Sequence, residues 1–423
     1  MNNDRKQLIP DLRFPEFVNS WKKMELGQLC DYWNGLSHEN GVNNFGKYFL
    51  ISLNSIDIDG NLKSDMKRVS YTDNSLNRND LVMVLSDVAH GNFLGLTDII
   101  PSNNYVLNQR MAGLRIKSLD KTDSYFLRSY INKNQNYFKK NGQGSSQLNL
   151  SKGSVTKFPI LLPQDLLEQQ KIASCLSSLD ELITAQKEKL ELLKNHKKGL
   201  MQNLFPQEGE TVPKFRFPEF ENDGEWKPTT VEKNCVLKGR IGYRGYTKED
   251  LVRKGEGAIV LGGKHIQNQL LYLADPTFLS WEKYYESPEI MVEKNHIIFS
   301  QRGSLGDCAI IDNEIGKATI NPSMVLMKNF KCDERFLYYV LIGEAIQREV
   351  ARVSSLAAIP MLSQKQIKEF PFLIPLPKEQ KKIAICLSFL DNLISAQTGK
   401  IERLQLHKKG LMQGLFPKVI DQI

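Results

Sequence analysis

Apolar residues recur at alternating steps of four and three in two long segments of the chain. They are Ile172, Leu176, Leu179, Ile183, Leu190, Leu193, Leu200 and Leu204 in the first segment, and Ile383, Leu387, Leu390, Ile394, Ile401, Leu404, Leu411 and Leu415 in the second. This spacing, held for about five heptads, predicts two long helices with coiled-coil seams. Gln186 and Gln397 fall on seam positions, where a polar side chain can fix the register.

Between these segments the apolar pattern is short and irregular. Apolar runs rich in β-branched residues and bounded by Gly, Asn, Asp or Pro predict strands at 48–56, 81–86, 295–300 and 319–327. We also expect short helices at 124–140 and 334–353. The fold class that we expect is α+β, with two mixed α/β domains separated by two long helices that pair as an antiparallel coiled coil. The alternative is that each helix packs only on its own domain.

The two helical segments are copies of each other. The string His-Lys-Lys-Gly-Leu-Met-Gln at 196–202 returns at 407–413, an offset of 211 residues (196 to 407), and 168–206 is identical to 379–417 at 27 of 39 positions. A short arm, Arg-Phe-Pro-Glu-Phe followed by Trp, also occurs twice, and we predict that its aromatic residues pack on the protein rather than contact a ligand. The stretches 24–160 and 227–372 barely match. Two near-identical frames with two divergent inserts predict two different recognition surfaces.

The repeat sets the predicted domain boundaries. We expect an N-terminal arm at 1–23, a first variable domain at 24–163, a first helix at 164–206, an arm repeat at 207–226, a second variable domain at 227–375, a second helix at 376–417 and a tail at 418–423. The prolines of 158–163 and 370–375 fix an extended lead-in to each long helix.

Composition and charge narrow the class of protein. The chain of 423 residues is too long for one hydrophobic core. A net charge of +8 favours a polyanionic partner such as DNA, although many other proteins are this basic. Its six cysteines form no CxxC pair and no zinc-type spacing with the histidines, so we expect reduced thiols and no metal site. There is no apolar signal core and no apolar run long enough to cross a membrane, so we expect a cytoplasmic protein.

Taken together, the repeated frames resemble the specificity subunit of type I restriction–modification systems. The phrases Leu-Pro…Glu-Gln-Gln-Lys-Ile-Ala at 162–173 and Leu-Pro…Glu-Gln-Lys-Lys-Ile-Ala at 376–384 are similar to the family's entry into its conserved helices. The resemblance implies two target recognition domains, each of which reads one half of a bipartite, asymmetric DNA site, with the helices setting the spacer. It also implies two methyltransferase subunits docked on this chain and restriction subunits in the full complex. S-adenosylmethionine, ATP and magnesium would then be bound by the partner subunits, and no cofactor by this chain.

Candidate DNA-binding residues lie in polar loops that follow predicted strands or helices. Glycine lets the backbone approach a DNA groove closely. Arg can donate two hydrogen bonds to guanine, and Asn or Gln can donate one to adenine and accept one from it. In the first variable domain the candidates are Ser86, His90, Asn92, Asn108, Gln109, Arg110, Lys139, Lys140, Gln143, Ser145, Ser146 and Gln147. In the second they are Arg240, Tyr243, Arg244, Gln301, Arg302 and Ser304. For each of them a structural role in a turn, or on a solvated surface, is the alternative. For Lys197 and Lys408, which fall on seam positions, we prefer a role in structure or subunit docking to phosphate binding.

The sequence shows no catalytic constellation. It has no GxxxxGK[ST] loop and no HExxH helix, and the Asn-Pro-Ser-Met string at 321–324 lacks the second proline and the aromatic residue of the amino-methyltransferase motif. We therefore expect a non-catalytic DNA-recognition subunit. The alternatives are a structural adaptor that joins two protein-binding domains, and an enzyme of unfamiliar type.

Overall fold

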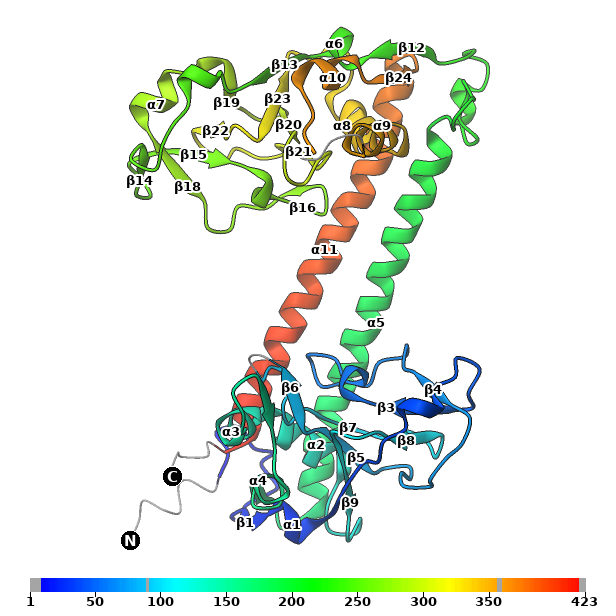
Figure 1. The fold of residues 1–423 in the computed structure, drawn as a ribbon, viewed down its shortest axis with the longest axis vertical. Coiled ribbons are helices and arrows are strands. Elements are labelled where there is room, and N and C mark those ends of the chain that lie inside the picture. Colours follow the sequence, from blue (N-terminus) through cyan, green and yellow to red (C-terminus); the bar gives the residue numbers. More distant parts are fainter. Residues whose placement is uncertain (1–8, 89–90, 356–359, 418–423) are drawn as a thin grey trace. The chain divides into compact units, whose positions relative to one another are not determined.

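Two compact units make up the chain. The computed structural model describes residues 9–88, 91–355 and 360–417 (Figure 1). Unit 1 comprises 1–187 and 399–423, and unit 2 comprises 188–398. Both long helices contribute to both units. Helix α5 (Leu166–Leu204) begins in unit 1 and ends in unit 2, whereas α11 (Pro377–Leu415) begins in unit 2 and ends in unit 1.

Unit 1 is built on two main sheets. The four-stranded antiparallel sheet has the order β2-β9-β5-β7, from Cys30–Asn34, Met111–Ile116, Leu81–Val84 and Thr97–Ile99. The other has the order β4-β3-β8, from Arg68–Val69, Tyr48–Ile51 and Tyr105–Leu107, with β3 and β8 parallel. Two further pairs join β1 (Lys22–Glu25) to β11 (Pro159–Leu162) and β6 (Ser86–Val88) to β10 (Gln147–Asn149). The short helices are α1 (Leu26–Leu29), α2 (Ser124–Lys133), α3 (Gln135–Asn141) and α4 (Lys152–Thr156).

Unit 2 has a similar arrangement although its sequence differs and its second sheet has five strands instead of three. Its four-stranded sheet has the order β13-β23-β20-β21, from Val236–Gly239, Met324–Lys328, Ile297–Ser300 and Cys308–Ile310. Its second sheet has the order β14-β18-β15-β22-β19, from Leu251–Val252, Thr277–Ser280, Gly257–Leu261, Ala318–Ile320 and Met291–Val292, and β15 and β22 are again parallel. Two pairs join β12 (Lys227–Thr230) to β24 (Pro371–Ile374) and β16 (Ile266–Gln267) to β17 (Leu270–Leu271). The short helices are α6 (Val231–Asn234), α7 (Trp281–Tyr285), α8 (Glu334–Ile342), α9 (Glu344–Ser354) and α10 (Gln364–Glu369).

The structure corrects three details of the predicted elements. The run 48–56, expected as one strand, is β3 followed by a short 3-10 helix at Leu53–Ser55. The helices expected at 124–140 and 334–353 are each a pair, because Asn134 and Gly343 adopt non-helical backbone angles between them. The run 319–327, expected as one strand, is divided into β22 and β23 by a turn at 321–323. The predicted fold class is confirmed, and the aspartates before α2 and α8 cap those helices at equivalent places.

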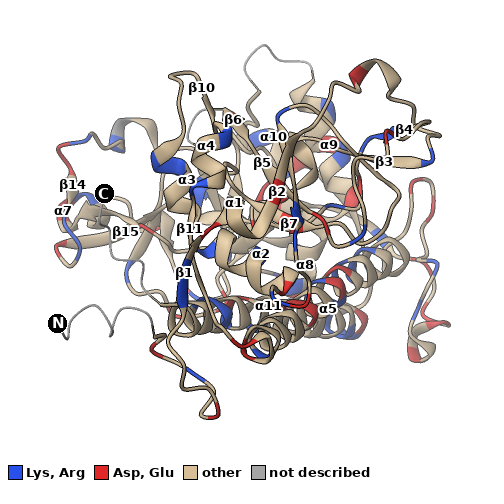
Figure 2. Ribbon diagram, turned by 90° about the horizontal axis from the view of Figure 1, so that it is seen from below, with Lys and Arg blue, Asp and Glu red and all other residues tan. Residues whose placement is uncertain are grey.

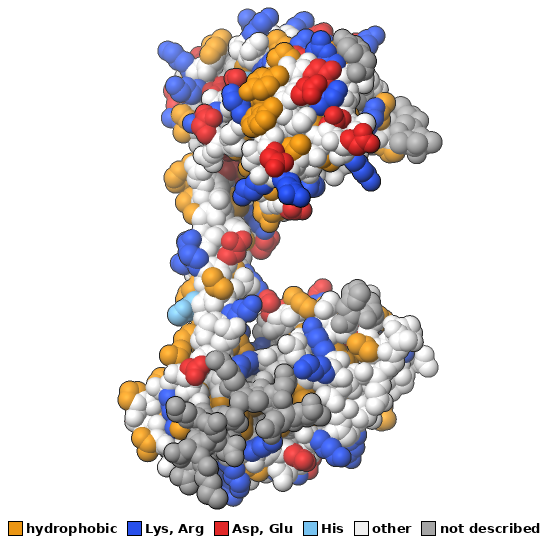
Figure 3. Space-filling view, turned by 90° about the vertical axis from the view of Figure 1, so that its left-hand side faces the viewer, with side chains coloured by type: hydrophobic (Ala, Val, Ile, Leu, Met, Phe, Trp, Pro, Cys, Tyr) orange, Lys and Arg blue, Asp and Glu red, His pale blue; other side chains and the backbone are white. Residues whose placement is uncertain are grey.

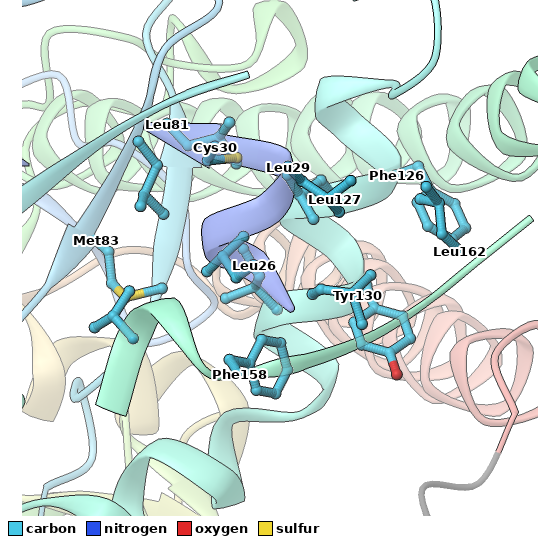
Figure 4. Close-up of a cluster of buried hydrophobic side chains, with 14 of the residues drawn as sticks. Leu26, Leu29, Cys30, Leu81, Met83, Phe126, Leu127, Tyr130, Phe158 and Leu162 are labelled. Carbon is cyan, nitrogen blue, oxygen red and sulfur yellow. The ribbon is translucent and has the colours of Figure 1, made fainter. Parts of the chain in front are cut away.

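Each unit completes its core with the end of a long helix. Figure 4 shows Leu26 of α1, Phe126 and Tyr130 of α2, and Phe158, which directly precedes β11, gathered in the core of unit 1. Phe416, at the end of α11, packs into this core, with its ring centroid 5.4 Å from that of Phe126. In unit 2, Phe205 at the end of α5 stacks on Phe336 at 5.7 Å and meets Trp226 at 6.0 Å. The aromatic residue before the terminal proline of each helix therefore packs in the unit where that helix ends.

Within each unit the two helical segments run antiparallel (Figure 1). In unit 1 the last turn of α11 lies against the core beside the first turn of α5, and farther along Lys408 forms an ion pair with Asp180. In unit 2 the equivalent pair is Lys197 with Asp391, at 2.5 Å. These ion pairs give Lys197 and Lys408 a structural role, which is one of the two roles, structure or subunit docking, that we preferred to phosphate binding. The alternative of helices that pack only on their own domains is wrong. Gln397 is buried and Gln186 half-buried, and their role in setting the register stays a prediction.

A buried carboxylate fixes each arm to the start of a long helix. Glu168, 1% exposed, accepts from Arg13 Nε at 2.7 Å and from Trp21 Nε1 at 3.0 Å. Glu379, also 1% exposed, accepts from Arg216 Nε at 2.9 Å and from Trp226 Nε1 at 3.3 Å. The predicted packing role of the arms agrees with this geometry.

Candidate nucleic-acid interface

Three loops of unit 1 converge on the residue that follows strand β5. The N–H group of Leu85 donates to the carbonyl of Arg110 at 3.0 Å, and the carbonyl of Leu85 accepts from Leu150 at 2.8 Å. Residue 85 thereby ties β6 to the turn at 108–110 and to the loop at 143–149. We call the described residues 86–88, 108–110 and 143–149 the first loop cluster.

Unit 2 holds an equivalent cluster on the equivalent residue. The N–H group of Gln301 donates to the carbonyl of Ser323 at 2.9 Å, and the carbonyl of Gln301 accepts from Leu362 at 3.0 Å. Residues 302–306, 321–323 and 360–362 form this second loop cluster. In both units the third loop leads into a short helix capped by a serine side chain, Ser151 or Ser363. The same backbone scaffold therefore holds loops of different sequence in the two units.

The loop cluster of unit 1 contains half of the twelve residues predicted in the first variable domain at exposed or half-buried positions. Exposed side chains are Gln109, Arg110, Gln143, Ser145 and Ser146, with Gln147 half-buried. Arg110 has a left-handed φ of 69°, which turns the chain sharply there. Asn92 and Lys140 are exposed and Lys139 is half-buried beside this cluster. His90 lies outside the described residues.

Asn108 and Ser86 have structural roles. Asn108 is 2% exposed; its side-chain oxygen accepts from the His38 N–H group at 3.0 Å, and its Nδ2 donates to Glu39 at 2.7 Å. Ser86 is also 2% exposed, and its hydroxyl donates to Asn149 Oδ1 at 2.7 Å. Because both side chains are buried, neither Asn108 nor Ser86 is a candidate for direct contact with DNA bases.

The predicted arginine cluster of unit 2 is largely internal. Arg240 is 8% exposed, and its guanidinium donates to the Ile320 carbonyl and to Thr319 Oγ1 at 3.3 and 3.0 Å. Burial lowers the pKa of Arg240 below its ordinary value, and the nearby Tyr246 offsets only part of this effect. Arg244 is half-buried and its Nη1 contacts Glu289 Oε2 at 3.4 Å. The Tyr243 side chain lies outside the described residues. Arg240 therefore links the end of β13 to β22, and its prediction as an exposed residue that follows the DNA backbone was wrong.

Arg302 and Ser304 are exposed in the second loop cluster, as predicted. Gln301 is 9% exposed, and its Nε2 donates to the Pro322 carbonyl at 2.9 Å, so that its side chain joins two of the loops. The string at 321–324 occupies the same turn as 108–111, between the parallel strand of one sheet and the central strand of the other. The string therefore forms a turn that both units share.

Asn149 and Met361 were missed by the sequence analysis. They pair with Ser86 and Arg302 across the two loops. A signal was present: both stand nine residues before the Phe-Pro dipeptides at 158 and 370 and directly before a Leu-Ser dipeptide. That alignment would have matched the two loops despite their different lengths.

Charge alone does not mark the interface. Figure 2 shows basic residues on α3 of unit 1, which packs against α4. Figure 3 shows Lys and Arg interspersed with Asp and Glu on the face of unit 2 that it presents. Phosphate contacts position a protein on DNA without reading its sequence. The loop chemistry is therefore more informative than net charge.

Three other expectations, on the cysteines, on a metal site and on membrane spans, can be compared with the described residues. All six cysteines are free thiols, and burial raises the pKa of Cys30 and of Cys235 to about 12, so these two thiols stay protonated. Among the described residues there is no group of three or more His, Cys, Asp or Glu side chains placed to hold a metal ion. No helix in the described part of the chain is long and apolar enough to span a bilayer.

Two loop clusters on one repeated scaffold define a protein with two recognition surfaces. Residues 19–195 and 239–406 each match the family described as type I restriction modification DNA specificity domain. The chain is 24% identical over 419 residues to the type I restriction enzyme MjaVIII specificity subunit of Methanocaldococcus jannaschii, which covers 96% of this chain and 93% of that protein. It is also 24% identical over 435 residues to the putative MjaX specificity subunit of the same organism, covering 94% and 96%.

Solved structures have the same fold. The crystal structure of a type I restriction–modification S subunit from M. genitalium is similar with a TM-score of 0.64 and 17% identity, covering 97% of this chain and 100% of that one. A chain from a structure concerned with assembly and conformational transition of the type I system is similar with a TM-score of 0.54 and 14% identity, covering 95% and 98%. Because the family matches more than half of the sequence, the chain belongs to the type I restriction–modification specificity family. It is a DNA sequence-recognition subunit with two specificity domains.

Proposed function

We propose that each unit reads one half of a bipartite, asymmetric DNA site through its loop cluster. The observation that carries this proposal is the equivalence of Leu85 and Gln301: the same backbone contacts hold loops whose side chains differ. A shared scaffold would present both clusters to the same feature of DNA, and different side chains would select different bases. The two halves of the target are then unlike in sequence.

The long helices set the gap between the two half-sites in this proposal. Each is 39 residues long, or roughly 58 Å at 1.5 Å per residue. Readers that address one face of B-DNA require a spacing near a helical turn of about 34 Å or its multiples. Helices of fixed length shared by both units supply a constant spacing.

The exposed faces of the helices support docking of two identical methyltransferase subunits. Several side chains are exposed and identical at equivalent positions of α5 and α11: Leu182 and Leu393, Ala185 and Ala396, Lys189 and Lys400, His196 and His407. Core packing does not require identity at exposed positions, so the repeat points to the same partner surface twice. Gly199 and Gly410 lie in helix interiors, where a Cβ would meet nothing within 4 Å. A glycine there leaves room for a close neighbour.

Catalysis belongs to the partners in this proposal. The methyltransferase subunits would bind S-adenosylmethionine, and the restriction subunits ATP and magnesium, while this chain supplies the sequence specificity. The full complex then methylates or cleaves DNA through those subunits.

Methylome sequencing of host DNA after co-expression with the cognate methyltransferase subunit tests the function. We expect a new bipartite methylated motif with two unlike halves that is absent when this chain is omitted. A soluble complex that produces no new motif and binds no DNA sequence selectively would contradict the proposal and favour a protein adaptor.

A further inference from the structure

In each loop cluster, the residue that follows Leu85 or Gln301 lies opposite one residue of the third loop. In unit 1 this cross-strand pair is Ser86 with Asn149. In unit 2 it is Arg302 with Met361. Because Leu85 and Gln301 make the same two backbone hydrogen bonds, the pairs occupy equivalent places on the scaffold. The two units therefore present different chemistry at one position.

In unit 2 the position carries an exposed guanidinium group. Arg302 Nε donates to Met361 Sδ at 2.9 Å, and a thioether is a weak acceptor. Within the described residues, neither terminal nitrogen of Arg302 has a hydrogen-bond acceptor or a carboxylate partner. Five other arginines of unit 2 are each paired with a carboxylate: Arg216, Arg244, Arg335, Arg348 and Arg352. The next residue, Gly303, has φ 79° and open space where a Cβ would stand. Backbone and guanidinium are both accessible to a ligand.

In unit 1 the same position carries carboxamides oriented by a buried hydroxyl. Asn149 is exposed; its Oδ1 accepts from Ser86 at 2.7 Å, and its Nδ2 donates to the Gln147 carbonyl at 3.1 Å. The Gln147 side chain donates to the same Ser86 hydroxyl. An asparagine amide has two acceptor and two donor sites, so Asn149 retains one of each in a fixed orientation.

We propose that this cross-strand position determines specificity in both units. Arg302 reads a guanine through its O6 and N7 atoms, and Asn149 reads an adenine through its N6 and N7 atoms, both in the major groove. These are the pairings that the two side chains favour on geometric grounds. The proposal rests on the proposed function, namely that the loop clusters contact DNA.

The test uses the complex of the full chain with its methyltransferase subunit. Binding is measured on duplexes that carry every single base-pair change of the methylated motif. For Arg302→Ala we expect discrimination at one G·C pair of one half-site to fall about ten- to a hundred-fold, with the other half-site unchanged. Asn149→Ala is expected to relax one A·T pair in the other half-site to a similar extent. Arg302→Lys keeps the charge but loses the planar fork, so it should retain overall affinity and still lose discrimination.

Arg253→Ala is the matched control. Arg253 is another exposed arginine of unit 2 whose side chain has no hydrogen bond within the described residues, and it follows β14 at the edge of the other sheet. It should leave discrimination unchanged. A uniform loss of affinity for all sequences in Arg302→Ala, with a weaker salt dependence, would assign Arg302 to a phosphate and overturn the inference. So would unchanged discrimination. A wild-type complex without a bipartite motif would instead overturn the proposed function.

Discussion

The two units are alike where side chains are buried and unlike where loops meet solvent. Glu168 and Glu379 are equally buried and each binds one arginine and one tryptophan. At the cross-strand position, by contrast, unit 1 has a buried serine and unit 2 an exposed arginine. A buried carboxylate must have its partners or it destabilises the fold, so a repeat retains it. The side chains at exposed loop positions need no buried partner, so they can differ between the units and select different bases.

Exchange of one variable segment should have the largest effect, because it should change the DNA specificity of one unit and leave that of the other unit unchanged. Replacing 24–160 with the equivalent segment of another specificity subunit should replace one half of the methylated motif completely and leave the other half intact. The reason is that the first loop cluster lies wholly within that segment. The affinity for the original half-site, relative to other sequences, should fall on the order of a thousand-fold, because several base contacts are lost. Methylome sequencing reads both halves in one experiment.

The reciprocal exchange of 227–372 is the control, and it should replace only the opposite half. A change in both halves after either exchange would show that the units do not read independently.

Substitution of the buried carboxylates should have the next largest effect, this time on the shared frame. Glu168→Gln and Glu379→Gln each leave a largely buried arginine without its charge partner. We expect each to lower the free energy of unfolding by about 3 kcal/mol, measured by denaturant titration. Glu181→Gln, at an exposed position of α5, should change it by less than about 0.5 kcal/mol. Unequal losses for Glu168 and Glu379 would show that the frames are not energetically equivalent.

The helices and the repeat could be predicted from sequence because their apolar spacing is regular over many turns. Ile172 and Ile383 begin two seams that the structure places in two helices of 39 residues. The sheet topology was not predictable, because short strands such as β8 and β22 pair in parallel with strands distant in sequence. Only tertiary contacts select those pairings.

The candidate site was predicted only in part, because residue type does not report burial. Asn108 and Arg240 have the chemistry of base or phosphate readers, yet both are buried and hydrogen-bonded inside the fold. Arg302 has the same chemistry and is exposed. Asn149 gains its importance from an orienting contact with Ser86, 63 residues away in sequence. Such long-range contacts are not encoded in a local motif.

Lengthening both helices should alter the gap without altering what either unit reads. Four residues inserted after Gln186 and four after Gln397 add about 6 Å to each helix and about one full turn. We expect the spacer of the methylated motif to lengthen by about two base pairs, with both half-sites unchanged. Insertion in only one helix, which disrupts the antiparallel pairing, serves as the comparison and should weaken binding instead. An unchanged spacer in the double insertion would argue against the helices as the determinant of the gap.

Gly199→Ala and Gly410→Ala should have the smallest effect on stability, and they test whether the two units have equivalent docking faces. Each replaces a helix-interior glycine at a site where a Cβ meets nothing in this chain, so each should stabilise the fold by up to about 1 kcal/mol. If a methyltransferase subunit approaches closely at these positions, the same methyl group should weaken its binding, measured as subunit stoichiometry by native mass spectrometry during titration. Each single variant should then retain one tightly bound methyltransferase subunit, and the double variant none. A gain in stability with full stoichiometry would place the partner on another face of the helices. One added methyl group at a close contact is enough to separate the helix from the methyltransferase subunit.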